Sequence, residues 1–222
     1  MFKIARGPMR KYFGSSITKK LVVTLAGLFL IVFLLVHLTI NLFLLKSDPS
    51  TFNSAAHFMG NNIVVKVFEV ILLLLFAVHI VGAVVLQIQN WMARPVRYKV
   101  ANHSQTSFFS KYMIYLGGVV FVFLVLHFIN FYFVKIGLVQ GDPDNFYAMA
   151  HGLFGLPLYV VIYVFSFLVL SFHLHHAFQS AFQTIGLNHQ KYTPAVKLLG
   201  LAYSILVPAG FAVIPIVIYF SK

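Results

Sequence analysis

The chain has 222 residues, of which 60% are apolar and 9% charged, with a formal net charge of +12 and no cysteine. A soluble domain carries about 25% charged residues, so the composition excludes a soluble globular protein, and 25 Phe and 11 Tyr exclude a disordered chain. The missing cysteines exclude a thiolate zinc site, an iron–sulfur cluster and a Cys-attached haem on this chain. We therefore expect an all-α integral membrane protein, with residues 1–222 forming a single membrane domain.

Five apolar segments are long enough to cross a bilayer as helices, which takes about 20 residues. In chain order they are residues 21–45, 63–88, 112–134, 153–182 and 198–220. The first is too long for a cleaved signal peptide, and no small-residue cleavage site follows it. Pro157, Pro208 and Pro215 lie within or beside the last two segments, and we expect them to kink those helices. The sequence thus predicts a bundle of five transmembrane helices.

The basic residues predict the orientation of this bundle. Of the 16 Lys and Arg residues, six precede the first segment, four lie between the second and third, and two lie between the fourth and fifth. Cytoplasmic loops are enriched in Lys and Arg, so we expect a cytoplasmic N-terminus and an outer C-terminus. Because these residues border apolar runs, they suit anionic lipid headgroups, and we do not expect nucleic-acid binding.

Each of the first four segments contains a histidine in its interior, at His37, His79, His127 and His173. An ionisable residue inside a span marks a functional site, although a single histidine is equally well explained by a hydrogen bond to a neighbouring helix. At 1.5 Å per residue, His37 and His127 lie roughly 12–14 Å from the outer ends of their helices. His79 and His173 lie roughly 20 Å from the inner ends. The four histidines therefore form two pairs by depth.

Two histidines that face each other at one depth can ligate the iron of a six-coordinate haem inside a bundle. We therefore expect two b haems, an outer one on His37 and His127 and an inner one on His79 and His173. His176 lies on the same face as His173 and stays an alternative inner ligand. A three-histidine zinc site that includes the intervening His175 is not expected, because this residue points about 200° around the helix from His173.

Small residues follow the inner pair on the same helix faces. Gly82 and Ala83 come three and four residues after His79, and Ala177 comes four after His173. Such residues leave room for a porphyrin, but they also serve close helix packing.

Glu69 is the only acidic residue within an apolar segment. It is either a boundary residue paired with Lys66 or a proton relay and quinone contact near the outer haem. His57 and Asn61 precede the same end of that segment, and an imidazole titrates near neutral pH. We group His57, Asn61 and Glu69 as candidates for a quinone and proton site.

Arg94, Arg97 and Lys99 form a basic loop between the second and third segments. Such a loop orients the protein and binds lipid. The alternative is that these residues dock a soluble partner or bind haem propionates.

Several local motifs resemble those of one known family. They are Ser-Ser-Ile-Thr-Lys-Lys at 15–20, Val-His-Leu-Thr-Ile-Asn-Leu at 36–42, and the stretches 52–59, 93–98 and 172–180. Together with the histidine depths, they make the chain similar over essentially its whole length to the dihaem cytochrome b membrane anchor of succinate dehydrogenase and fumarate reductase. The similarity is to the five-helix, single-anchor bacterial type. In that family, helices one and three hold the distal haem, and helices two and four hold the proximal one. The family's Phe-His motif, with a small residue four positions later, favours His173 with Ala177.

The resemblance implies a three-subunit complex in the bacterial cytoplasmic membrane. A flavoprotein subunit acts on succinate or fumarate, an iron–sulfur subunit carries electrons to the anchor, and two b haems exchange them with a quinone, commonly menaquinone. This chain would then supply electron transfer and the quinone site, without acting on the dicarboxylate itself. The alternatives are the cytochrome b anchor of another respiratory enzyme, such as a hydrogenase or formate dehydrogenase, and a histidine-relay transporter without haem.

Overall fold

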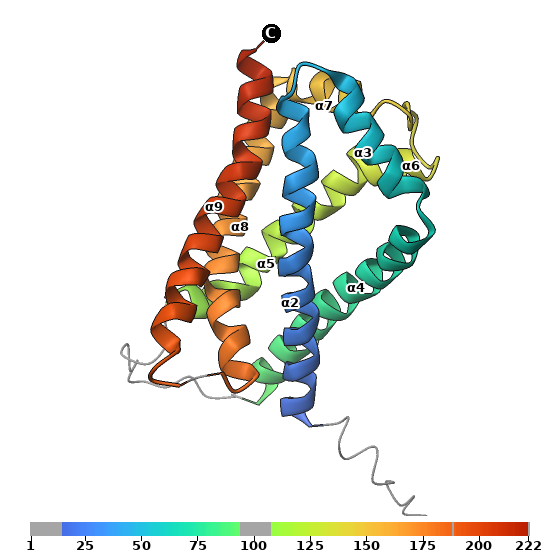
Figure 1. Cartoon of the computed structure of the whole chain (residues 1–222). Helices are drawn as coiled ribbons and strands as arrows, with labels where there is room; N and C mark the ends of the chain where they lie inside the picture. Colours follow the sequence, from blue (N-terminus) through green and yellow to red (C-terminus); the bar gives the residue numbers. More distant parts are fainter. Residues whose placement is uncertain (1–14, 94–107, 188, 222) are drawn as a thin grey trace, which may run out of the picture.

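A computed structural model describes residues 15–93, 108–187 and 189–221. These residues form helices and turns and contain no strand (Figure 1). The elements are α2 (Ser16–Asn41), the 3-10 turn η1 (Leu42–Leu45), α3 (Pro49–Asn61), α4 (Ile63–Met92), α5 (Phe108–His127), the π-helical turn η2 (Phe128–Tyr132), α6 (Phe133–Lys135), α7 (Phe146–Phe154), α8 (Pro157–Thr184) and α9 (Thr193–Phe220).

Five helical segments of the described chain are long and apolar enough to cross a membrane, as expected for a multi-pass membrane protein. They are Ser16–Leu45, Ile63–Met92, Tyr112–Lys135, Pro157–Thr184 and Thr193–Phe220. The described residues thus confirm the predicted all-helical class and the prediction of five helices long and apolar enough to span a membrane. The expected start of the fourth span at residue 153 was wrong, because α7 ends at Phe154 and α8 begins with Pro157. Proline is well tolerated in the first turn of a helix, where its missing N–H has no helical partner to lose.

The short helices α3 and α7 were not predicted, and both lie at the end of the bundle where α9 finishes (Figure 1). We call this the α3–α7 end, and the opposite end, where α2 begins, the N-terminal end. Asn53 of α3 donates to Asn145 Oδ1 (3.1 Å) and accepts from the Tyr147 backbone N–H (3.0 Å). Asn145 in turn caps α7 by accepting from the Ala148 N–H. These side-chain bonds join α3 to α7.

The long helices pack as two groups. Helix α2 packs mainly on α4, while α8 packs on both α5 and α9, and α4 contacts α5 over only a few residues. Most of the described buried core lies in the second group, including Tyr163, Phe167, Leu170 and Leu174 of α8 and Val207, Phe211, Ile214 and Ile218 of α9. Helix α4 has no buried residue. The two groups are therefore packed very differently.

The packing of α8 on α9 includes a partly buried hydrogen bond next to a proline. Pro208 lies inside α9 and has no N–H, so the carbonyl of Ser204, four residues earlier, lacks its helical donor. Ser171 Oγ of α8 donates to this carbonyl over 2.6 Å. Because a neighbouring side chain satisfies the freed group, the proline is tolerated within the span.

Candidate functional site

A large apolar cavity lies between the two helix groups. Its volume is about 1840 Å³, and α2, α4, α5 and α8 all contribute to its wall. A pocket for one drug-sized ligand measures roughly 300–1,000 Å³. The cavity is therefore large enough for more than one ligand of that size. His37, His79, His127 and His173 all line it.

The first histidine pair lies toward the α3–α7 end. The rings of His37 on α2 and His127 at the end of α5 have centroids 5.8 Å apart and planes at 85°. Phe33 stacks on His37 and Phe123 stacks on His127, each from one helical turn earlier. The Nδ1 atom of His127 is buried and has no hydrogen-bond partner among the described residues, and Asn41 Nδ2 lies 3.4 Å from His37 Nδ1.

The second pair joins α4 to α8. The ring centroids of His79 and His173 are 6.5 Å apart, with planes at 79°. His79 Nδ1 lies 3.1 Å from the Val23 carbonyl. A carbonyl can only accept, so Nδ1 carries the proton and Nε2 keeps a free lone pair for a metal. His173 Nδ1 is buried, and no residue in the described part of the chain forms a hydrogen bond with it.

Glycines allow the rings of the second pair to lie against neighbouring helices. A Cβ added at Gly27 would lie 3.1 Å from His79 Cε1, and one at Gly117 would lie 3.6 Å from His173 Cε1. Of the two roles that the sequence leaves open for Gly82, the structure shows close helix packing, because an added Cβ would lie 2.3 Å from the Val23 side chain of α2. Ala83 and Ala177 do line the cavity.

Both ring pairs fit a metal held between two imidazoles. With metal–nitrogen bonds of about 2.0 Å, two imidazoles on opposite sides of one metal have centroids about 6 Å apart. The observed distances of 5.8 Å and 6.5 Å bracket that value. Among the described residues no group of three or more His, Asp or Glu side chains converges, and each histidine pair brings two imidazoles together. His173 is the ring that faces His79, while His176 lines the cavity one turn further along α8.

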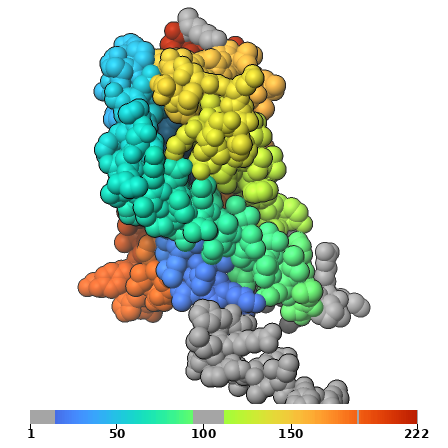
Figure 2. Space-filling model, turned by 90° about the vertical axis from the view of Figure 1, so that its right-hand side faces the viewer, coloured from blue at the N-terminus to red at the C-terminus, as the bar shows by residue number. Residues whose placement is uncertain are grey.

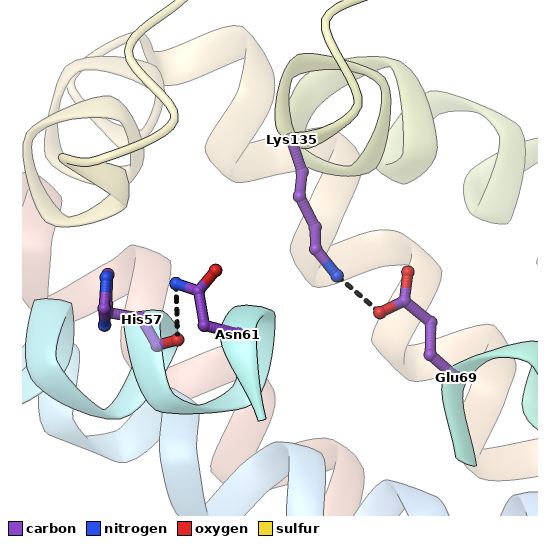
Figure 3. A network of polar contacts seen from close by, with 4 residues as sticks. All are labelled: His57, Asn61, Glu69 and Lys135. Atoms are coloured by element: carbon purple, nitrogen blue, oxygen red, sulfur yellow. Dashed lines mark hydrogen bonds and ion pairs between the residues drawn. The ribbon is translucent and has the colours of Figure 1, made fainter. Parts of the chain in front are cut away.

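A polar group lies at the wall of the cavity near the α3–α7 end (Figure 3). Glu69 Oε2 of α4 and Lys135 Nζ of α6 are 2.5 Å apart, and their side chains are 23% and 30% exposed. His57 and Asn61 of α3 border the pair, and the Asn61 amide donates to the His57 carbonyl. Among the described residues Glu69 pairs with Lys135 and not with Lys66, the partner named in one of the two alternatives from the sequence.

Several residues at the site were not singled out from the sequence. Lys135 is far from Glu69 in the chain, and no local pattern marks it. Asn130 lies in the π-helical turn η2 directly after His127, and its amide donates to the buried Tyr163 hydroxyl over 2.9 Å. A π-helical turn often marks a functional site, but it has no clear sequence signal. Arg94, Arg97 and Lys99 lie outside the described residues.

Comparisons with family models, with characterised proteins and with solved structures give no match to this chain.

Proposed function

We propose that the chain is the haem-binding membrane anchor of a bacterial succinate:quinone oxidoreductase. In this proposal two bis-histidine b haems carry electrons between an iron–sulfur subunit and a membrane quinone, menaquinone. The observation that carries the proposal is the presence of two facing imidazole pairs in one apolar cavity, each with the spacing of ligands on a single metal. The resemblance of the local motifs supports the choice of enzyme family.

The chain's own residues would hold and orient the two groups. His37 and His127 would ligate one iron, and His79 and His173 the other. The Val23 carbonyl would fix the His79 tautomer through its Nδ1–H. Bound haem would supply reversible one-electron transfer between the two faces of the membrane.

Polar residues at the N-terminal end of the cavity suit the carboxylates of a haem. An ammonium group and several hydrogen-bond donors line the cavity there, on Lys20, Thr24, Asn90, His176 and Ser180. Charge-assisted hydrogen bonds to a carboxylate are stronger than neutral ones. We place the iron–sulfur and flavoprotein subunits at this end, which the positive-inside rule assigns to the cytoplasm.

The polar group near the α3–α7 end suits a quinone. Glu69 supplies a carboxylate that can accept a proton, and Asn61 and His57 supply hydrogen-bonding groups beside the same cavity. A quinone bound there would lie on the side of the His37–His127 pair, at the far end of the electron path from the soluble subunits.

A visible difference spectrum, reduced minus oxidised, with a haem count per chain tests this proposal. We expect two low-spin b haems in the purified protein. His79→Ala should remove one of them and leave the other, because only one iron loses a ligand. His189→Ala is the control, an exposed histidine outside the cavity lining, and it should keep both haems.

Protein made with ample haem that contains none would overturn the proposal. Retention of both haems in His79→Ala would instead overturn the assignment of the pair. Once the two haems are established, their reduction by succinate in the complete complex identifies the partner enzyme as a succinate dehydrogenase or fumarate reductase.

A further inference from the structure

The cavity reaches the protein surface beside the Glu69–Lys135 ion pair. Phe68, Val70 and Ile136 all line the cavity, yet each remains exposed by about half, at 54%, 59% and 46%. Figure 2 shows a hollow on this face between α3 and the segment that follows the third span. Exposed apolar side chains thus lie beside the pair together with the exposed polar residues Asn61 and Lys66. This mixture suits an opening at the outer edge of the bilayer, where apolar chains meet polar headgroups.

The ion pair crosses this opening from one wall to the other. Lys135 extends from the end of the third span, and its stem passes Gly60 of α3, where an added Cβ would lie 3.9 Å from Lys135 Cε. Its ammonium group then reaches Glu69 of α4 and lies 5.8 Å from the Tyr132 ring centroid. Helices α4 and α5 contact each other over only a few residues, and the pair joins α4 to α6, which follows α5 and η2 in the same span.

We propose that the Glu69–Lys135 ion pair closes an opening to the bilayer, and that Lys135 must move away for an apolar ligand to enter the cavity. The identity of this ligand as a quinone rests on the proposed function. Lys135 is a positioning residue in this scheme, since it acts through Glu69 and the width of the opening. The lysine side chain is long and flexible enough to turn toward the polar groups at the α3–α7 end without movement of the helices.

Partly exposed ion pairs contribute little to the free energy of the state in which they form, so little free energy is needed to break the Glu69–Lys135 pair. Removal of such a pair changes an equilibrium constant or a rate constant by about two- to five-fold. We therefore expect Lys135→Met to raise the rate of ligand entry by about two- to five-fold. Lys135→Arg can still pair with Glu69 and should keep the wild-type rate.

Lys66→Met is the matched control. It removes the same charge from the same part of the cavity wall, three residues from Glu69, without breaking the observed pair. An effect of net charge alone would appear in both methionine variants, whereas an effect of the closed opening would appear only in Lys135→Met.

The absence of cysteine makes a thiol reporter straightforward. Leu73 lines the cavity one helical turn behind Glu69, so Leu73→Cys places the only thiol there. Labelling by a lipophilic N-alkylmaleimide in liposomes, followed by mass spectrometry, measures access without any need for haem. We expect faster labelling when Lys135→Met is added and no acceleration with Lys66→Met.

A second measurement uses the complete complex and menadione, a naphthoquinone without a lipid tail. Lys135→Met should raise kcat/KM for menadione at low concentration, while a general packing defect would lower kcat. Equal labelling rates in Lys135→Met and Lys66→Met would overturn the inference. A protein without haem would overturn the proposed function, and the labelling result would still decide whether Lys135 closes the opening.

Discussion

The two helix groups differ in what holds them together. Helices α8 and α9 bury a continuous set of large side chains, whereas α4 buries none among its 30 residues. Each histidine pair joins one group to the other, α2 to α5 and α4 to α8. The α8–α9 group is therefore held by its own packing, and the proposed function implies that the α2–α4 group depends on the two bound haems.

The largest expected effect is that of haem removal. A ligand that binds only the folded state stabilises it by about 4 kcal/mol when present at 1,000 times its Kd. Protein made without haem should therefore lose amide-exchange protection in α4 by up to about 1,000-fold, while α8 and α9 keep most of theirs. Hydrogen exchange read by mass spectrometry makes this comparison within one sample. An equal loss of amide-exchange protection in both helix groups would show that the α2–α4 group does not depend on haem more than the α8–α9 group does.

The second largest effect is expected where the His79 ring of α4 lies against Gly27 of α2. Gly27→Val should displace the His79 ring, because even a Cβ at this position lies only 3.1 Å from His79 Cε1. We expect loss of one of the two haems by spectrum and pyridine haemochrome count. Gly152→Val is the control, since a Cβ added at that helical glycine meets nothing within 4 Å. The idea fails if the two valine variants bind haem equally well.

A smaller effect is expected within the well-packed group. Ser171→Ala leaves the Ser204 carbonyl without a donor, which costs about 1 kcal/mol. Pro208→Ala restores an N–H to that carbonyl, so the serine substitution should cost less in the Pro208→Ala background. Thermal unfolding in detergent of the four proteins of this double-mutant cycle measures the coupling. An identical cost in both backgrounds would mean that the serine bond does not replace the helical one.

The sequence predicted those features that depend on distance along a helix. The spans follow from hydropathy, and the grouping of His37 with His127 and of His79 with His173 follows from depth, since the rise per residue is fixed. Contacts set by helix packing could not be predicted in this way. Lys135 is 66 residues from Glu69. The sequence instead suggests Lys66 as a possible ion-pair partner of Glu69, because residues one turn apart share a helix face.

The short helices show a second limit of the sequence. Both α3 and α7 are too short to give a strong periodic pattern, and their positions depend on Asn53 and Asn145 meeting across 92 residues of chain. Asp48-Pro49-Ser50 does carry a start signal for α3, an N-cap followed by proline at the first helical position. That signal marks where a helix can begin, but it gives neither the length of the helix nor its position in the fold.

The smallest expected effect concerns this N-cap, at the end of the cavity that α3 covers. Asp48 accepts hydrogen bonds from the Ser50 hydroxyl and from the Ser50 N–H (3.0 Å), and these bonds hold the pKa of the Asp48 carboxyl below its ordinary value. The bonds favour the charged carboxylate in the folded state. Their stabilising effect is therefore fully present above the ordinary pKa of an aspartate and is lost as the pH falls through the lowered value.

We accordingly expect amide exchange in α3, corrected for the intrinsic rate, to accelerate modestly as the solution becomes strongly acidic. The effect is small because the carboxyl is exposed to solvent. Asp48→Ala should show the faster exchange at every pH and lose the acid dependence, whereas Ser54→Ala, a change at an exposed serine one turn further along α3, should behave as wild type. If Asp48→Ala kept the acid dependence, another group would control the start of α3, and the α3–α7 end would owe its stability to the Asn53–Asn145 contact instead.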